Sequence, residues 1–321
     1  MRVNLVLATF ILLQNIVYSQ SELGESERNL IKSQGIRIKE QWDYKYSGNA
    51  LAGKGFVSSR TTYDRDGRVL EVVNYKSDTA VIDISISVYN SNGDRTDYIK
   101  YKGNRTSLIF KQITQYRAPK LKSAEFGFNG VEEFRNQYNY NASGQLIEIK
   151  YFTSKRLDEV RSFNYAGNET IVMVKDANGN ILSYIKSRND EKGRLIEEKK
   201  LDKDQKVTEQ KNYTYDSKGN LLTEEKKSPL KKTVRTEYVY DRLGKLQEVY
   251  YDGGEDLKYL KQSYSFASNG FLTGEFWKNS PSAEQSFRKY NYDSKGRLLS
   301  TDCYFASYKY KVLNKFVYQS Y

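Results

Sequence analysis

The sequence predicts an all-β protein, a repetitive antiparallel β-meander of about twenty strands that is curled into a shell or wide barrel. Three observations carry this prediction. Glycines recur near a 26-residue period, the same aromatic phrase precedes several of them, and the segments between turns are short and rich in Tyr, Val, Ile and Thr. These segments are too short for ordinary helices, so each repeat reads as strand, tight turn, strand and loose turn.

The tight turns are the clearest element of the repeat. The phrase Tyr-x-Tyr-Asp stands three residues before a glycine in YTYDSKGNL (213–221), YVYDRLGKL (238–246) and YNYDSKGRL (290–298). Asp fits the first position of a type I turn, where its carboxylate accepts backbone N–H groups, and Gly fits the left-handed position that follows. The predicted turn residues are Asp64, Gly67, Gly93, Gly144, Asp216, Gly219, Asp241, Gly244, Asp293 and Gly296.

The strands next to each turn predict which side chains share a face. Tyr238 and Tyr240 are two residues apart and therefore lie on one face, with Tyr240 expected opposite Lys245. Ile147, Ile196, Leu222 and Leu299 are expected on this tyrosine face, and the leucine two after each glycine, as in Leu146, Leu195, Leu221, Leu246 and Leu298, on the other. Open twisted sheets rarely exceed about ten strands, so the sheet should bend, with the tyrosine ladder inside.

The chain begins with a predicted export signal. Arg2 precedes an apolar run over residues 3–13, and Ser19 offers a small residue for cleavage before Gln20. The expected organisation is a signal peptide over 1–19, a linker over 20–34 and the repeat domain over 35–321. The protein is therefore expected in the periplasm, at the cell surface or outside the cell.

The composition removes several classes of function. The chain has no histidine, so it has no Ser-His-Asp triad and no histidine-based metal site. Its one cysteine, Cys303, has no partner for an internal disulfide. The net charge of +12 comes from interleaved acidic and basic residues without a nucleic-acid-binding motif. We expect a monomer without cofactor, metal or nucleic acid.

The unit Tyr-x-Tyr-Asp-x-x-Gly-x-Leu resembles the YD or Rhs repeat of bacterial Rhs proteins and animal teneurins. The resemblance covers roughly Tyr63 to Thr301. It implies a long β-strip that spirals into a hollow shell, and family members are often carbohydrate-binding or cell-surface proteins. No toxin domain of the Rhs kind is expected after Cys303. The chain is similar also to small secreted bacterial proteins built only of such repeats, some with a porin-like barrel.

The first functional hypothesis is therefore an exported, non-enzymatic YD-repeat protein that binds a carbohydrate or protein partner at the cell envelope or outside the cell. Tyrosine rings stack on sugar faces and add a hydroxyl group, so a tyrosine ladder offers a binding surface. The candidate ligand-binding residues are Tyr213, Tyr215, Tyr238, Tyr240, Tyr290 and Tyr292.

Two alternatives remain open. A glycan-active hydrolase would use paired carboxylates at a fixed separation, and the 40 acidic residues single out no pair. An outer-membrane β-barrel would need a lipid-facing apolar band about 25 Å tall. Segments such as LIEEKKL (195–201) and LLTEEKK (221–227) place charges on both faces, so membrane insertion is not expected.

Overall fold

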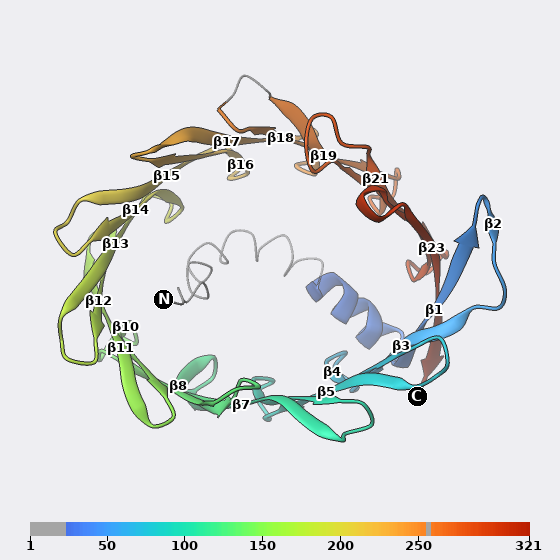
Figure 1. Cartoon of the computed structure of the whole chain (residues 1–321), viewed down its shortest axis with the longest axis horizontal. Helices are drawn as coiled ribbons and strands as arrows, with labels where there is room; N and C mark the ends of the chain where they lie inside the picture. Colours follow the sequence, from blue (N-terminus) through green and yellow to red (C-terminus); the bar gives the residue numbers. More distant parts are fainter. Residues whose placement is uncertain (1–23, 255–257) are drawn as a thin grey trace.

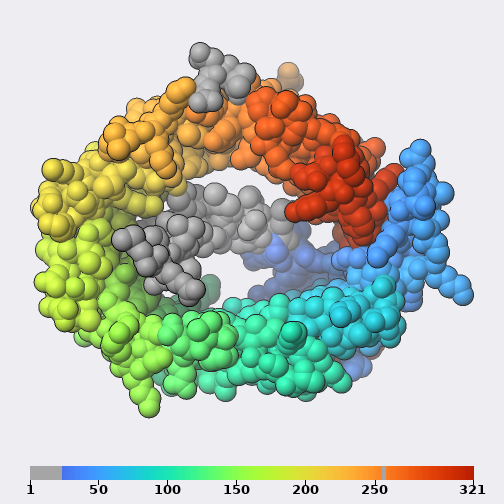
Figure 2. Space-filling model, viewed as in Figure 1, coloured from blue at the N-terminus to red at the C-terminus, as the bar shows by residue number. Residues whose placement is uncertain are grey.

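The chain folds into a closed ring of antiparallel strands around a hollow centre (Figures 1 and 2). The computed structural model describes residues 24–254 and 258–321. In this part of the chain 23 strands follow one another, and the last, β23 (Tyr310–Ser320), pairs with the first, β1 (Ile36–Ser47). The two-residue strand β2 (Ala50–Leu51) pairs only with β1, which leaves 22 strands in the barrel. The predicted all-β meander is confirmed, and it closes.

Each remaining strand pairs with the strands before and after it, so the meander has no crossover connection. A single turn of 3₁₀-helix, η1 (Ala306–Tyr308), separates the last two strands. The other strands are β3 (Phe56–Tyr63), β4 (Val69–Tyr75), β5 (Val81–Tyr89), β6 (Arg95–Lys102), β7 (Ser107–Ala118), β8 (Leu121–Phe128), β9 (Glu133–Tyr140), β10 (Leu146–Thr153), β11 (Arg156–Ala166), β12 (Glu169–Asp176), β13 (Ile181–Asn189), β14 (Leu195–Asp202), β15 (Val207–Tyr215), β16 (Leu221–Ser228), β17 (Lys231–Tyr240), β18 (Leu246–Asp252), β19 (Tyr259–Phe266), β20 (Leu272–Trp277), β21 (Ser286–Tyr292) and β22 (Leu298–Phe305).

The tight turns between strands share one hydrogen-bond pattern. The Gly219 N–H donates to the Asp216 carbonyl oxygen at 3.1 Å, and the Asp216 N–H donates to the Asn220 carbonyl oxygen at 2.9 Å. The Asp216 carboxylate also accepts the Asn220 N–H at 2.8 Å. Gly219 has φ +95°, a left-handed conformation that glycine adopts without strain. The same turn holds the other predicted positions, Asp64, Gly67, Gly93, Gly144, Asp241, Gly244, Asp293 and Gly296.

The turn at Asp190 gives a prediction about pH. The Arg194 guanidinium donates to the Asp190 carboxylate at 2.7 Å, and this bond, with the Arg194 and Lys192 N–H groups, lowers the pKa of Asp190. A lowered pKa adds stability above the ordinary carboxyl pKa, and this stability is lost as pH falls through the folded value. Asp190→Asn keeps the oxygen acceptor, as Asn90 shows in its own turn. We expect the variant to be less stable at pH 7, with a difference that shrinks as pH falls through the folded pKa of Asp190, as measured by urea titrations; a difference that does not change with pH would contradict this account.

An irregularity after each tight turn changes the predicted faces. Tyr240 lies opposite Leu246 rather than Lys245. The neighbouring pair is Val239 and Glu248, so the register of the two strands shifts by one residue between these pairs. This β-bulge adds one residue to the second strand, and a shift by one residue moves side chains to the other face. The leucine two after the glycine therefore shares the tyrosine face, and the prediction that placed it on the other face is wrong. Ile147, Leu222 and Leu299, which follow these leucines, are exposed, and their predicted place on the tyrosine face stays a prediction.

An α-helix over residues 24–33 forms within the segment that was predicted as a linker (20–34), and it lies inside the ring beside β3 and β4 (Figure 1). Ile31 of this helix, Ile36 and Tyr63 form a buried cluster, against which Val69 and Tyr318 pack. This contact defines the tyrosine face as the inner face of the barrel. The predicted signal peptide (1–19) lies outside the described residues. Within the described part of the chain, no helix has the length and apolar character to cross a membrane.

Candidate functional site: the inner wall

The six tyrosines proposed as a ligand-binding surface all lie on the inner wall. Tyr213 and Tyr215 of β15 lie opposite Glu224 and Leu221, and the pairs on β17 and β21 occupy equivalent positions. The structure thus gathers Tyr213, Tyr215, Tyr238, Tyr240, Tyr290 and Tyr292 on one face of neighbouring repeats. They are buried or half-buried in the wall.

The Tyr215 hydroxyl, next to its turn, has a structural partner in the preceding repeat. Tyr215 donates to the Leu195 carbonyl oxygen at 2.8 Å, and the Arg194 guanidinium lies 4.7 Å from the centre of its ring. The bulge takes this carbonyl out of the regular ladder, and the tyrosine supplies the missing donor. The same bond joins other repeats, in the pairs Tyr89–Val69, Tyr165–Leu146 and Tyr318–Leu298.

Tyr213 and Tyr215 provide a matched pair for testing this role. The Tyr213 hydroxyl is buried and has no hydrogen-bond partner among the described residues. Tyr215→Phe should lower the free energy of unfolding by about 1 kcal/mol, because it leaves the Leu195 carbonyl unsatisfied. Tyr213→Phe should be neutral or slightly stabilising, since it removes an unsatisfied polar group. Urea titrations of both variants measure the difference, and equal losses would contradict the carbonyl-capping role.

Charged side chains line the middle of the inner wall between β14 and β16. Glu198 is 4% exposed and lies opposite Lys211. Lys200 lies 3.0 Å from Glu209, which also pairs with Lys226 at 2.5 Å. Sequence reasoning recognised charges on both faces of these strands but assigned the inner ones no role. The signal was present as Glu and Lys at every second position, and only closure of the sheet makes it a lumen surface.

A second polar cluster lies across the lumen, centred on Glu125 of β8. Its carboxylate accepts hydrogen bonds from the Tyr138 hydroxyl at 2.5 Å and the Gln112 amide at 3.0 Å. Lys122 lies 2.5 Å from the same group. A buried carboxylate with three partners is satisfied within the wall. The inner surface therefore carries charged and polar groups on β8 as well as between β14 and β16.

The helix over residues 24–33 occupies part of the lumen next to the seam. Lys32 lies 3.0 Å from the Asp66 carboxylate, and the Arg28 guanidinium donates to the Asp66 carbonyl oxygen at 3.1 Å. Lys39 of β1 holds Glu27 of the helix at 2.5 Å. These contacts fix the helix to the tight-turn rim, so it narrows one side of the opening.

The inner wall carries no recognisable catalytic constellation in the part of the chain that the structure describes. Within residues 24–254 and 258–321, no group of three or more Asp, Glu or Cys side chains is placed to hold a metal ion. Cys303 is 2% exposed, and its sulfur lies 3.6 Å from the Thr301 hydroxyl. The predicted absence of enzymatic activity stays a prediction.

The outer face of the wall is divided into two sectors. On β5 the outward residues Ile82, Ile84, Ile86 and Val88 alternate with Asp83, Ser85, Ser87 and Tyr89 of the inner wall. On β13 to β17, by contrast, outward charges form ion pairs, with Lys199 and Arg188 both on Glu197, and Arg235 on Glu237. The outward side chains of β5 are therefore aliphatic, although Ile86 lies opposite Glu71, and the other sector is a charged surface.

Closure and the polar inner wall define the class of this protein as a wide, hollow β-barrel. No known family model and no curated protein matches the chain, so the YD/Rhs resemblance stays a prediction.

The Tc holotoxin pore of Photorhabdus luminescens is a structural match at 12% identity and a TM-score of 0.20, covering 78% of this chain. The chain spans only 20% of that protein's length. A porin-like protein from Bacteroides uniformis matches at 10% identity and TM-score 0.32, over 88% of this chain and 98% of that one. A porin-like protein from Bacteroides vulgatus matches at 13% and 0.28, over 58% and 95%. Similarity this low carries no conclusion about function.

The first functional hypothesis, an exported protein that binds a carbohydrate or protein partner through its tyrosines, is wrong. The sheet does not offer an open tyrosine face but closes on itself into a 22-strand barrel, the architecture of the outer-membrane alternative. Among the six candidate residues, Tyr215 already uses its hydroxyl on the Leu195 carbonyl oxygen, and its ring packs against the Arg194 guanidinium.

Proposed function

We propose that the chain is an outer-membrane β-barrel that encloses a water-filled lumen. The closed ring of 22 antiparallel strands with a charged inner wall carries the proposal. Barrels of this size cannot be filled by their own side chains and enclose a channel or a plugged lumen. Bacterial outer-membrane barrels have an even number of antiparallel strands and a polar interior, as this one has. The predicted signal peptide over residues 1–19 would direct the protein to the cell envelope.

The test uses the full chain, with two variants of one strand. The protein is refolded with phospholipid vesicles, and flotation with the vesicles and conductance across a planar bilayer are measured. Ile86→Lys places a second charge on the outward face of β5, opposite Glu71, and should reduce flotation, since a lysine facing lipid costs about 2–4 kcal/mol at mid-depth. Ser85→Lys, one residue away on the lumen face, should float like wild type. Failure of wild type to float or conduct would overturn the proposal.

A second candidate is a water-soluble hollow barrel of the envelope. It is favoured by the ion pairs on the outer face of β13 to β17, where a lipid-facing wall would be apolar. In the same experiment this candidate predicts protein that remains in the aqueous fraction without detergent and is insensitive to Ile86→Lys.

A further inference from the structure

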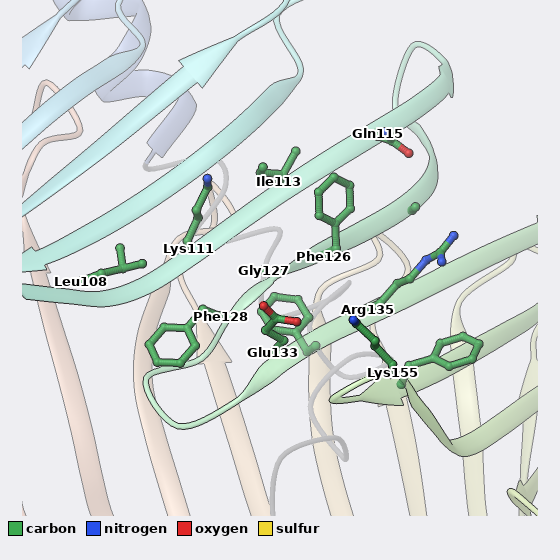
Figure 3. Close-up of a pocket in the computed structure, with 13 residues that line it drawn as sticks. Leu108, Lys111, Ile113, Gln115, Phe126, Gly127, Phe128, Glu133, Arg135 and Lys155 are labelled. Atoms are coloured by element: carbon green, nitrogen blue, oxygen red, sulfur yellow. The ribbon is translucent and has the colours of Figure 1, made fainter.

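A large hollow lies on the outside of the barrel wall across β7, β8 and β9. Its volume is about 880 Å³. Ile113, Phe126 and Arg135 lie opposite one another in register across these strands. The neighbouring residues Phe110 and Phe134 point to the inner wall, where their rings stack 6.1 Å apart. Most of the lining side chains stand on the outward face, so the hollow opens to the surroundings of the barrel (Figure 3).

The floor of the hollow is apolar. Phe126 and Phe128 of β8 stand on the outward face beside Ile113 of β7, and Leu108 and Phe152 extend the surface at its ends. Ligand sites in proteins typically have volumes of about 300–1,000 Å³ and are lined mainly by apolar and aromatic side chains. The hollow has the size and lining of such a site.

Three cations, Lys111, Arg135 and Lys155, and one carboxylate, Glu133, stand around this floor. Across residues 24–254 and 258–321, none of the three cations has a carboxylate within ion-pair distance, although some cations elsewhere on the outer face do, such as Lys199, which lies 2.9 Å from Glu197. Three positive charges and one negative charge leave an excess of two positive charges. A bound anion would pair with these cations and balance the excess positive charge.

We propose that this hollow binds an anionic lipid, with an acyl chain on the phenylalanine floor and a phosphate group held by Lys111, Arg135 and Lys155. Charge complementarity selects the headgroup, because guanidinium and ammonium groups donate charge-assisted hydrogen bonds to phosphate oxygens. The apolar floor selects a molecule with a chain rather than a free phosphate, since burial of each methylene contributes about 0.8 kcal/mol. The site belongs to the outer wall, and it requires neither conductance nor full membrane insertion.

The test is a calorimetric titration of the full folded chain with single-chain lipids below their micelle concentration. Lauroyl lysophosphatidate should bind at least tenfold more tightly than lauroyl lysophosphatidylcholine, which has the same chain and no net charge. Glycerol 3-phosphate, the headgroup alone, should show no measurable binding. The triple variant Lys111→Gln, Arg135→Gln, Lys155→Gln should lose the preference for the anionic lipid.

A matched control separates this site from general attraction to a positive protein. Lys175→Gln, Lys186→Gln and Lys289→Gln together remove the same charge from outward positions on β12, β13 and β21, and should change the affinity less than twofold. Phe126→Ser should weaken both lipids without changing their ratio. Equal binding of the two lipids, binding of glycerol 3-phosphate as tight as the lipid, or equal losses in the two triple variants would each overturn the proposal. All these readouts remain available if the barrel proves to be soluble.

Discussion

Removal of residues 310–321, which form β23, is expected to abolish the folded barrel. β23 pairs with β22 on one side and with β1 on the other, from Lys45 opposite Val312 to Ile36 opposite Ser320. Its loss exposes two long strand edges and uncovers the buried Cys303, which lies opposite Val312. Unpaired edges of this length are templates for aggregation. Far-UV circular dichroism and size-exclusion chromatography should show loss of the cooperative thermal transition and large aggregates.

The β2 hairpin offers the control for this deletion. β2 pairs only with β1 and lies outside the ring. Replacement of residues 48–55 by a short Gly-Ser linker removes a strand and its turns without opening the barrel. That variant should elute as wild type and melt cooperatively. A monomeric, cooperatively folded chain without β23 would contradict the closed ring.

Much of this fold could be predicted from the sequence, because the information is local. An Asp followed by a Gly three residues later fixes each tight turn through the carboxylate's own hydrogen bonds, as Asp216 and Gly219 show. Repetition of that turn near a 26-residue period is enough to predict a meander and its approximate number of strands. Closure is not local. It depends on accumulated twist and on the match between β1 and β23, which lie at opposite ends of the domain.

The faces of the strands and the candidate sites were harder to predict for a related reason. The bulge after each turn is invisible in the residue pattern, yet it carries Leu221 to the inner face opposite Tyr215. A tyrosine ladder has the same spacing whether it binds a ligand or caps carbonyl groups of the next repeat. The outer hollow combines residues of β7, β8, β9 and the β10–β11 turn, so no short segment contains its signal.

Gly127→Ala is expected to be strongly destabilising, although alanine is among the smallest possible changes. A Cβ atom at Gly127 would lie 1.7 Å from the carbonyl oxygen of Lys111 and 2.6 Å from its carbon. Both atoms belong to the backbone of β7, which cannot move aside without breaking its pairing with β8. We expect a loss of about 3 kcal/mol or more in the free energy of unfolding, measured by urea titration, as for other overpacked positions.

Gly144→Ala is the matched control, because a Cβ atom there meets nothing within 4 Å. Its φ of +83° makes alanine strained, at a cost of about 1 kcal/mol. Since Lys111 is also a cation of the outer hollow, displacement of β7 by Gly127→Ala should weaken the binding of lauroyl lysophosphatidate, whereas Gly144→Ala should leave it unchanged. Equal destabilisation by the two substitutions would show that backbone conformation, rather than the close approach of β7 and β8, accounts for the glycine at 127.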